Sequence, residues 1–145
     1  TSHIPGPKVD HLPYKDQEEQ KEKLVKCISR LLDDEQVKKH SFTILSPLQY
    51  EKSVVSKINE FEIKKYDPNN VEGISFSTIQ AFKGLESNTV ILTDIESFAD
   101  KQLLYVAISR ARTLLIVSYS KGAEVEYYKL LEGWIKSWQI QGARK

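Results

Sequence analysis

Four polar residues lie in one short connection between two apolar stretches, in the sequence STIQAFKGLESNTVIL. A strand is expected to end near Thr78, and another to begin by Thr89. Between them, Thr78, Gln80, Lys83 and Glu86 supply a hydroxyl, an amide, a cation and a carboxylate. In open α/β sheets, ligands bind at the carboxyl ends of the strands. We therefore expect these four side chains to share one edge of a sheet and to form a ligand site there.

Two arginines stand between apolar runs in the stretch LLYVAISRARTLLIV. A guanidinium is always charged, and arginine is rarely fully buried unless it is paired. Arg110 and Arg112 must therefore reach solvent, a carboxylate or an anionic ligand. The structural alternative for Arg110 is an ion pair with Asp94, Glu96 or another carboxylate. For Arg112, we expect pairing with a carboxylate or exposure to solvent.

Apolar runs bounded by turn residues predict a series of strands. The runs near the end of the chain are continuous rather than alternating, which favours a sheet that is covered on both faces. Strands are predicted over residues 8–14, where Pro13 limits the strand, and over 42–45, 62–67, 74–79, 89–95 and 114–118.

Helical spacing separates several of these strands. A helix is predicted over residues 16–32, where Asp16 and Glu19 form a capping box. A second helix is predicted after residue 47, from Tyr50, Val54 and Ile58. The last helix places four large side chains on one packing face: Tyr127, Leu131, Trp134 and Trp138. Strands that alternate with helices predict an α/β fold, a three-layer sandwich with a mainly parallel central sheet.

Composition sets limits on the function. The 145 residues carry a net charge of +1, so a nucleic-acid site must come from local clustering of charge. The one cysteine, Cys27, is expected to pack in the core, and the three histidines show no metal-ligand spacing. No apolar run is long enough to span a membrane, and we expect a cytoplasmic protein. Because the chain begins Thr-Ser and contains no methionine, we expect a piece of a longer protein.

Two stretches together resemble a known family. STIQAFKGLESNTVIL resembles motif V of the UvrD/Rep-like superfamily 1 helicases, whose pattern is Thr-x-His-x-x-Lys-Gly-Leu-Glu followed by an apolar strand. LLYVAISRAR resembles their motif VI, and the two motifs stand in the family's order. FTILSPLQYEKSVVSKI resembles the strand and helix that open the same domain. Gln80 departs from the family's histidine, and Ser87 from its aromatic residue.

The resemblance implies the C-terminal RecA-like motor domain of such a helicase, over residues 16–145, after an N-terminal tail and first short strand at 1–15. In the family, ATP binds between two motor domains, and the first carries the P-loop and the Mg²⁺ ligands. The P-loop pattern G-x-x-x-x-G-K-[ST] is absent from the sequence, so the chain alone is expected not to hydrolyse ATP appreciably. The implied partners are that first motor domain, on the same parent chain or a partner subunit, and single-stranded or duplex DNA rather than RNA.

Residue by residue, the resemblance assigns Arg110 as the arginine finger that neutralises charge on the γ-phosphate. It assigns Glu86 to the ribose, and Gly84 to the same ATP site. Thr78 and Gln80 match positions that touch the nucleic-acid backbone, and Lys83 could add one phosphate contact. The structural alternatives are capping for Thr78 and Gln80, a solvated turn for Glu86 and a solvated charge for Lys83. The alternative function is a degenerate RecA-like module that binds nucleic acid or a protein partner without chemistry.

Overall fold

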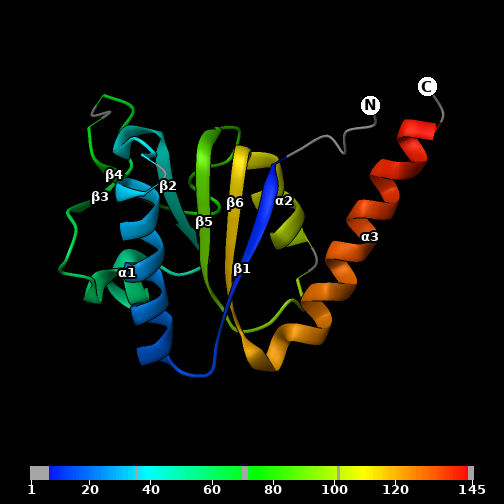
Figure 1. The fold of residues 1–145 in the computed structure, drawn as a ribbon, viewed down its shortest axis with the longest axis horizontal. Helices are drawn as coiled ribbons and strands as arrows, with labels where there is room; N and C mark the ends of the chain where they lie inside the picture. The colour runs from blue at the N-terminus through cyan, green and yellow to red at the C-terminus, as the bar shows by residue number, and fades with distance from the viewer. Residues whose placement is uncertain (1–6, 35, 70–71, 101, 144–145) are drawn as a thin grey trace.

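Along the chain, α-helices separate some of the strands, and turns alone separate others (Figure 1). The computed structural model describes residues 7–34, 36–69, 72–100 and 102–143, with every side chain in these ranges except those at 40 and 134–143. The elements are, in order, β1 (Lys8–Tyr14), α1 (Gln17–Asp33), η1 (Lys39–Ser41), β2 (Phe42–Ser46), η2 (Tyr50–Lys52), η3 (Val54–Lys57), β3 (Ile63–Lys65), β4 (Ile74–Thr78), β5 (Ser87–Ile95), α2 (Gln102–Arg110), β6 (Ala111–Ser120), η4 (Lys121–Ala123) and α3 (Glu124–Ala143), the η elements being 3-10 turns.

The six strands form one sheet in the order β1-β6-β5-β2-β4-β3, and each neighbouring pair is parallel. The predicted α/β fold with a parallel central sheet is therefore confirmed. β1 lies at one edge, where the missing N–H group of Pro13 costs no bond inside the sheet. The opposite edge is β3, a short strand that carries the exposed cations Lys64 and Lys65.

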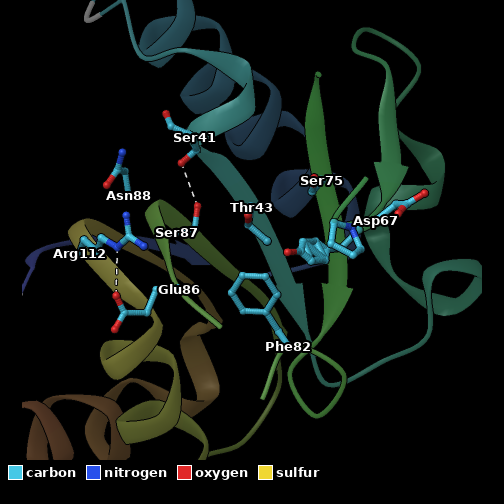
Figure 2. Close-up of a pocket in the computed structure, with 11 residues that line it drawn as sticks. Ser41, Thr43, Asp67, Ser75, Phe82, Glu86, Ser87, Asn88 and Arg112 are labelled. Carbon is cyan, nitrogen blue, oxygen red and sulfur yellow. Dashed lines mark hydrogen bonds and ion pairs between the residues drawn. The ribbon is translucent and has the colours of Figure 1, made fainter. Parts of the chain in front are cut away.

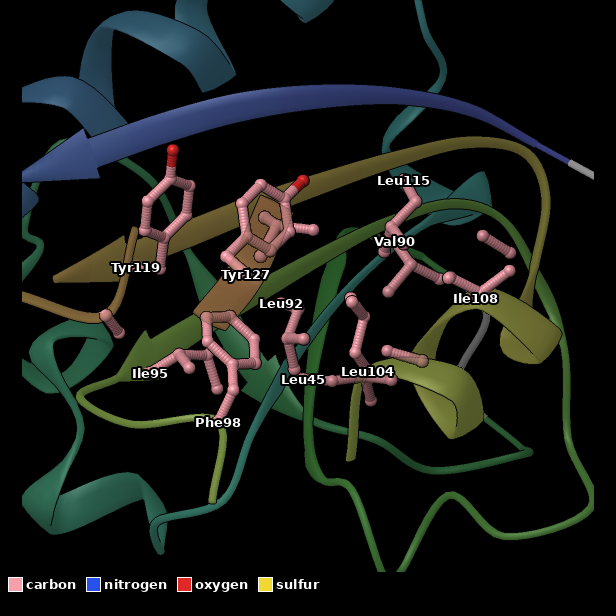
Figure 3. Packing of buried hydrophobic residues seen from close by; sticks show 14 of the residues in the cluster. Leu45, Val90, Leu92, Ile95, Phe98, Leu104, Ile108, Leu115, Tyr119 and Tyr127 are labelled. Atoms are coloured by element: carbon pink, nitrogen blue, oxygen red, sulfur yellow. The ribbon is translucent and has the colours of Figure 1, made fainter. Parts of the chain in front are cut away.

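Successive residues of the central strands face opposite sides of the sheet, and both sides are covered. On one side, Val90 and Leu92 of β5 pack with Leu104 of α2 and Tyr127 of α3 (Figure 3). On the other side, Ile91 joins a second cluster that includes residues of α1 and η3. This arrangement explains why the strands read as continuous apolar runs, because side chains on both faces of the sheet meet a covering layer.

α1 begins where the capping pattern predicts. The side chain of Asp16 accepts a hydrogen bond from the N–H group of Glu19 at 2.8 Å, and the Glu19 carboxylate accepts one from the N–H group of Lys15 at 3.0 Å. The apolar stripe of the helix packs on the sheet, and Cys27 is buried within it, as predicted.

The helix predicted after residue 47 is wrong. Residues 50–57 instead form two 3-10 turns, η2 and η3, which are interrupted at Ser53. Ser53 has extended backbone angles, and its hydroxyl donates a hydrogen bond to Asp94. A continuous α-helix would carry Ser53 away from that acceptor. The predicted apolar positions still pack inward: Val54 and Ile58 are buried, and Tyr50 is partly buried.

The last helix, α3, is confirmed, and toward its carboxyl end it leads away from the sheet (Figure 1). Tyr127 is fully buried and Leu131 packs against the same cluster, as the predicted stripe requires. The side chains of Trp134 and Trp138 lie outside the described residues. Among the helices that the structure describes, none combines the length and the apolar character needed to cross a bilayer.

Candidate functional site

The connection between β4 and β5 crosses one face of the sheet. Because the two strands are parallel, the chain must leave the carboxyl end of β4 and return to the amino end of β5. It does so through consecutive turns over residues 79–84, where Phe82 packs into the core and Gly84 adopts a φ of 81°. A residue with a side chain would be strained at that backbone angle, so Gly84 has a local structural role.

The expectation that all four polar residues share one sheet edge is therefore wrong. Thr78 ends β4 at the carboxyl edge, whereas Glu86 directly precedes β5 at the amino edge. Gln80 and Lys83 lie on the crossing segment between them and are exposed. The sequence identified the connection correctly, but the direction of parallel strands separates its two ends.

Arg110 is the last residue of α2 and directly precedes β6. The strand register pairs Ser87 with Ala111, so Glu86 and Arg110 each precede one member of this pair at the amino edge. The carboxyl end of a helix carries partial negative charge, which favours a cation such as Arg110 there. Two of the three residues that the resemblance assigns to ATP, Glu86 and Arg110, thus come to the same edge from separate elements.

One cleft of about 680 Å³ lies between the crossing segment and α2. It brings together four of the predicted site residues: Thr78, Gln80, Lys83 and Arg110. The sequence did not single out its other lining residues. These are Pro47 and Gln49 from the loop after β2, Ile79 from the turn, and Asp100, Gln102, Leu103 and Val106 from the start and inner face of α2. Gln49 could have been proposed from the sequence, because it follows closely on the carboxyl end of a buried strand.

Thr78 has a structural role as well as a place in the cleft. Its hydroxyl oxygen accepts a hydrogen bond from the N–H group of Ala81 at 3.1 Å, which is the capping alternative considered for this residue. A hydroxyl has one proton to donate and two lone pairs. The hydroxyl of Thr78 can therefore cap the turn and still donate to an anion in the cleft.

Arg110 has no ion pair or hydrogen bond with any residue that the structure describes, and its Nε atom is buried without a partner. The carboxylates proposed as its structural partners are engaged elsewhere. Asp94 accepts hydrogen bonds from Ser46, Ser53 and other donors, and Glu96 accepts one from the hydroxyl of Tyr14 at 3.1 Å. A half-buried, unpaired guanidinium that lines a cleft is arranged to meet an anionic ligand.

Arg112, two residues further on, has a different environment. Its Nε atom donates to Oε2 of Glu86 at 3.0 Å, and both side chains are more than half exposed (Figure 2). The expected carboxylate partner of Arg112 is thus Glu86 itself. Glu86 and Arg112 line a smaller pocket together with Ser41, Thr43 and Asn88. Glu86 therefore lies outside the cleft that holds Arg110.

No group of three or more histidine, cysteine, aspartate or glutamate residues in the described part of the chain is arranged to hold a metal ion. The cleft contributes two cations, Lys83 and Arg110, and one carboxylate, Asp100. Its chemistry suits a phosphate group rather than a metal cation.

The chain was compared with models of protein families. Residues 73–118 match the family model described as the UvrD-like helicase C-terminal domain. This segment contains all six predicted site residues, from Thr78 to Arg110, and it confirms the resemblance drawn from the two sequence motifs. A comparison with curated protein sequences finds no match.

Among solved structures, the chain is similar to the C-terminal domain of a possible DNA helicase from Lactobacillus plantarum WCFS1. The two chains share 21% sequence identity with a TM-score of 0.57, and the similarity covers 79% of this chain and 73% of that one. At this level of identity, the likeness establishes that the two chains share a fold.

Proposed function

We propose that this chain, which carries the UvrD-like helicase C-terminal segment at residues 73–118, is the second motor domain of an ATP-driven DNA helicase or translocase. The observation that carries the proposal is Arg110, an unpaired and partly buried guanidinium. It lines one cleft with Thr78, Gln80 and Lys83. The preference for DNA over RNA rests on the similar structure, which is described as part of a possible DNA helicase.

The arrangement at the amino edge fits one half of a nucleotide site. Arg110 is free of carboxylate partners in the described part of the chain, so its guanidinium can turn to γ-phosphate oxygens. Glu86 uses Oε2 for Arg112, which leaves Oε1 to accept from a ribose hydroxyl. Gly84 gives the crossing segment the left-handed turn that leads to Glu86. The P-loop and the Mg²⁺ ligands would come from the first motor domain, on the same parent protein or a partner subunit.

ATP bound with Mg²⁺ supplies the energy-yielding phosphoryl transfer. The work of Arg110 is electrostatic: a guanidinium binds two oxygens in a fixed geometry and stabilises negative charge that develops on them. An arginine supplied from outside the P-loop domain is worth roughly 10³–10⁵ in rate in other phosphoryl-transfer systems.

The nucleic-acid contacts are proposed for the other wall of the cleft. The hydroxyl of Thr78 and the amide of Gln80 can each donate to a backbone phosphate, and Lys83 adds a positive charge. These contacts read no bases, so the grip on the strand would be independent of sequence. Arg110 ends α2 and lines the same cleft. A movement of α2 on ATP binding or hydrolysis would therefore also change the contacts with the strand, which would couple the nucleotide state to strand binding.

The test is strand-stimulated ATP hydrolysis by a protein that unites this chain with its P-loop domain. Arg110→Ala is expected to lower kcat by a factor of roughly 10³ or more, while ATP still binds. Arg110→Lys keeps a charge but loses the bidentate geometry, and it should recover only part of the rate. Arg112→Ala is the matched comparison, because it also removes one guanidinium from the same short stretch. It is expected to keep at least about a tenth of the wild-type rate.

Two results would contradict parts of the proposal. If the Arg110→Ala variant hydrolyses ATP at the wild-type rate, the chain can still be part of a motor, but Arg110 is not its arginine finger. No hydrolysis by the wild type with any strand would instead favour the alternative, a degenerate RecA-like module that binds nucleic acid or a protein partner without chemistry.

A further inference from the structure

Asp94 has a backbone conformation that is uncommon for a residue other than glycine. Its φ is 64°, in the left-handed region, although it lies within a strand and is buried. The pairing of β5 with β6 shifts register between Leu92 and Ile95, so Asp94 sits in an irregularity of the ladder. Non-glycine residues in this region carry strain, and such strain persists only where the surrounding structure holds it.

The side chain of Asp94 explains what holds it. Oδ2 accepts hydrogen bonds from the hydroxyl groups of Ser46 at 2.6 Å and Ser53 at 2.5 Å. Oδ1 accepts from the N–H group of Val54 at 3.0 Å and from the side-chain amide of Gln20 at 3.3 Å. One carboxyl group thus connects β5 to α1, to the end of β2 and to the start of η3.

These bonds lead directly to the cleft. Ser46 and Ser53 are the two ends of the loop whose residues Pro47 and Gln49 line one wall. The carbonyl oxygen of Ser46 also accepts a hydrogen bond from the N–H group of Ile79 at 3.0 Å, and Ile79 adjoins Thr78 in the neighbouring part of the cleft lining. Asp94 is therefore hydrogen-bonded directly to the loop, and a second hydrogen bond, from Ile79 to Ser46, connects the loop to the turn.

We propose that Asp94 is a positioning residue for the cleft. It fixes the loop over residues 46–54 and, through Ser46, the turn at Thr78 and Ile79, so that these two neighbouring parts of the cleft lining are held ready for a nucleic-acid strand. A buried carboxyl group at a strained backbone angle is costly for a purely structural link. The proposal rests on the strand-binding role given to this cleft above, and nothing in it requires Asp94 to touch the strand.

Two substitutions distinguish the effect of the side-chain contacts of Asp94 from the effect of its backbone conformation. Asp94→Asn keeps the shape and tolerates the left-handed angle, and its amide can donate to both serine hydroxyls. Asp94→Gly fits the backbone angle with less strain but removes all four acceptor contacts. Ile116→Val is the control for lost stability, because Ile116 is fully buried in the cluster on the α1 side and is not part of this network.

The first measurement is the affinity of the chain for a fluorescein-labelled oligothymidine at low salt. Asp94→Gly is expected to weaken binding by about tenfold, whereas Asp94→Asn and Ile116→Val stay within about twofold of the wild type. Equal affinity for Asp94→Gly and wild type would overturn the inference. An equal loss in Ile116→Val would do the same, because the effect would then be general instability.

The second measurement needs no ligand. Hydrogen exchange of the Ile79 amide reports the bond to Ser46, and Asp94→Gly should raise its rate by about tenfold with Asp94→Asn near the wild-type rate. An unchanged rate in Asp94→Gly would refute the positioning role by itself. If the wild type binds no oligothymidine while the Ile79 amide responds as expected, the strand-binding role is what fails and the positioning of the cleft stands.

Discussion

Two arginines that are separated by one alanine have opposite environments. Arg110 ends α2, and Arg112 is the second residue of β6, so the change from helix to strand falls between them. This change directs one guanidinium into the cleft and the other to Glu86 at the surface. Charge and composition are the same for both residues, and the secondary-structure boundary decides what each can contact.

The ion pair between Arg112 and Glu86 is expected to add little to folding stability. Both side chains are more than half exposed, and solvent screens such pairs. Arg112→Ala should change the free energy of unfolding by less than about 1 kcal/mol, as measured by urea denaturation. A double-mutant cycle with Glu86→Ala isolates the pair. A coupling energy above about 2 kcal/mol would mean that the pair is part of a stabilising network that its exposure conceals.

At the scale of elements, α1 depends on its first turn. Asp16 provides the N-cap, and Glu19 completes the reciprocal bond to Lys15. Asp16→Ala should lower the free energy of unfolding by about 1 kcal/mol, because it leaves the N–H group of Glu19 without its acceptor. Thermal or urea unfolding measures the change, and Asp16→Asn serves as the control because asparagine caps almost equally well. Similar losses in both variants would show that the charge, rather than the cap, is what matters.

The sequence predicted those elements whose pattern is local. The strands β5 and β6 were found because both faces are apolar, and α1 was found because its cap and stripe agree. The helix expected around Val54 failed because a distant carboxyl group, Asp94, holds Ser53 in an extended conformation. Spacing within a segment carries no information about a partner some forty residues away, and such partners override local preference.

The candidate site was predicted in the same uneven way. The two motifs identified the residues, and Thr78, Gln80, Lys83 and Arg110 do meet in one cleft. The grouping with Glu86 was wrong because parallel strands require the connection to cross the sheet. The cleft wall from the loop after β2 could not be predicted, since it depends on the hydrogen bonds that end at Asp94.

For the molecule as a whole, the edge strand β1 is held to the last helix. His11 on β1 and Tyr127 on α3 are 116 residues apart, and Nδ1 of His11 lies 2.6 Å from the hydroxyl of Tyr127. Burial, with a further contribution from Tyr119, raises the pKa of Tyr127, so its hydroxyl keeps its proton and can donate to a neutral imidazole. The contact joins an early part of the sheet to the layer that covers it, and it places a titratable group at that junction.

This junction predicts a loss of stability in mild acid. His11 is exposed overall, but its ring packs against Tyr127 and Tyr128, and this partial desolvation lowers its pKa below the ordinary value near 6.5, while the nearby Asp10 opposes the shift only in part. The unfolded chain therefore takes up this proton at a higher pH than the folded protein does, so the contribution to stability is present above about pH 6.5 and is lost as the pH falls through the lowered pKa. Urea denaturation of wild type and His11→Gln at pH 7.5 and pH 5.5 measures the effect, with the smaller decrease expected in the variant. The carboxylates common to both proteins cancel in this comparison. Equal decreases would show that His11 titrates alike in the folded and unfolded chains, and an increase toward acid that His11→Gln abolishes would mean that Asp10 outweighs burial at this junction.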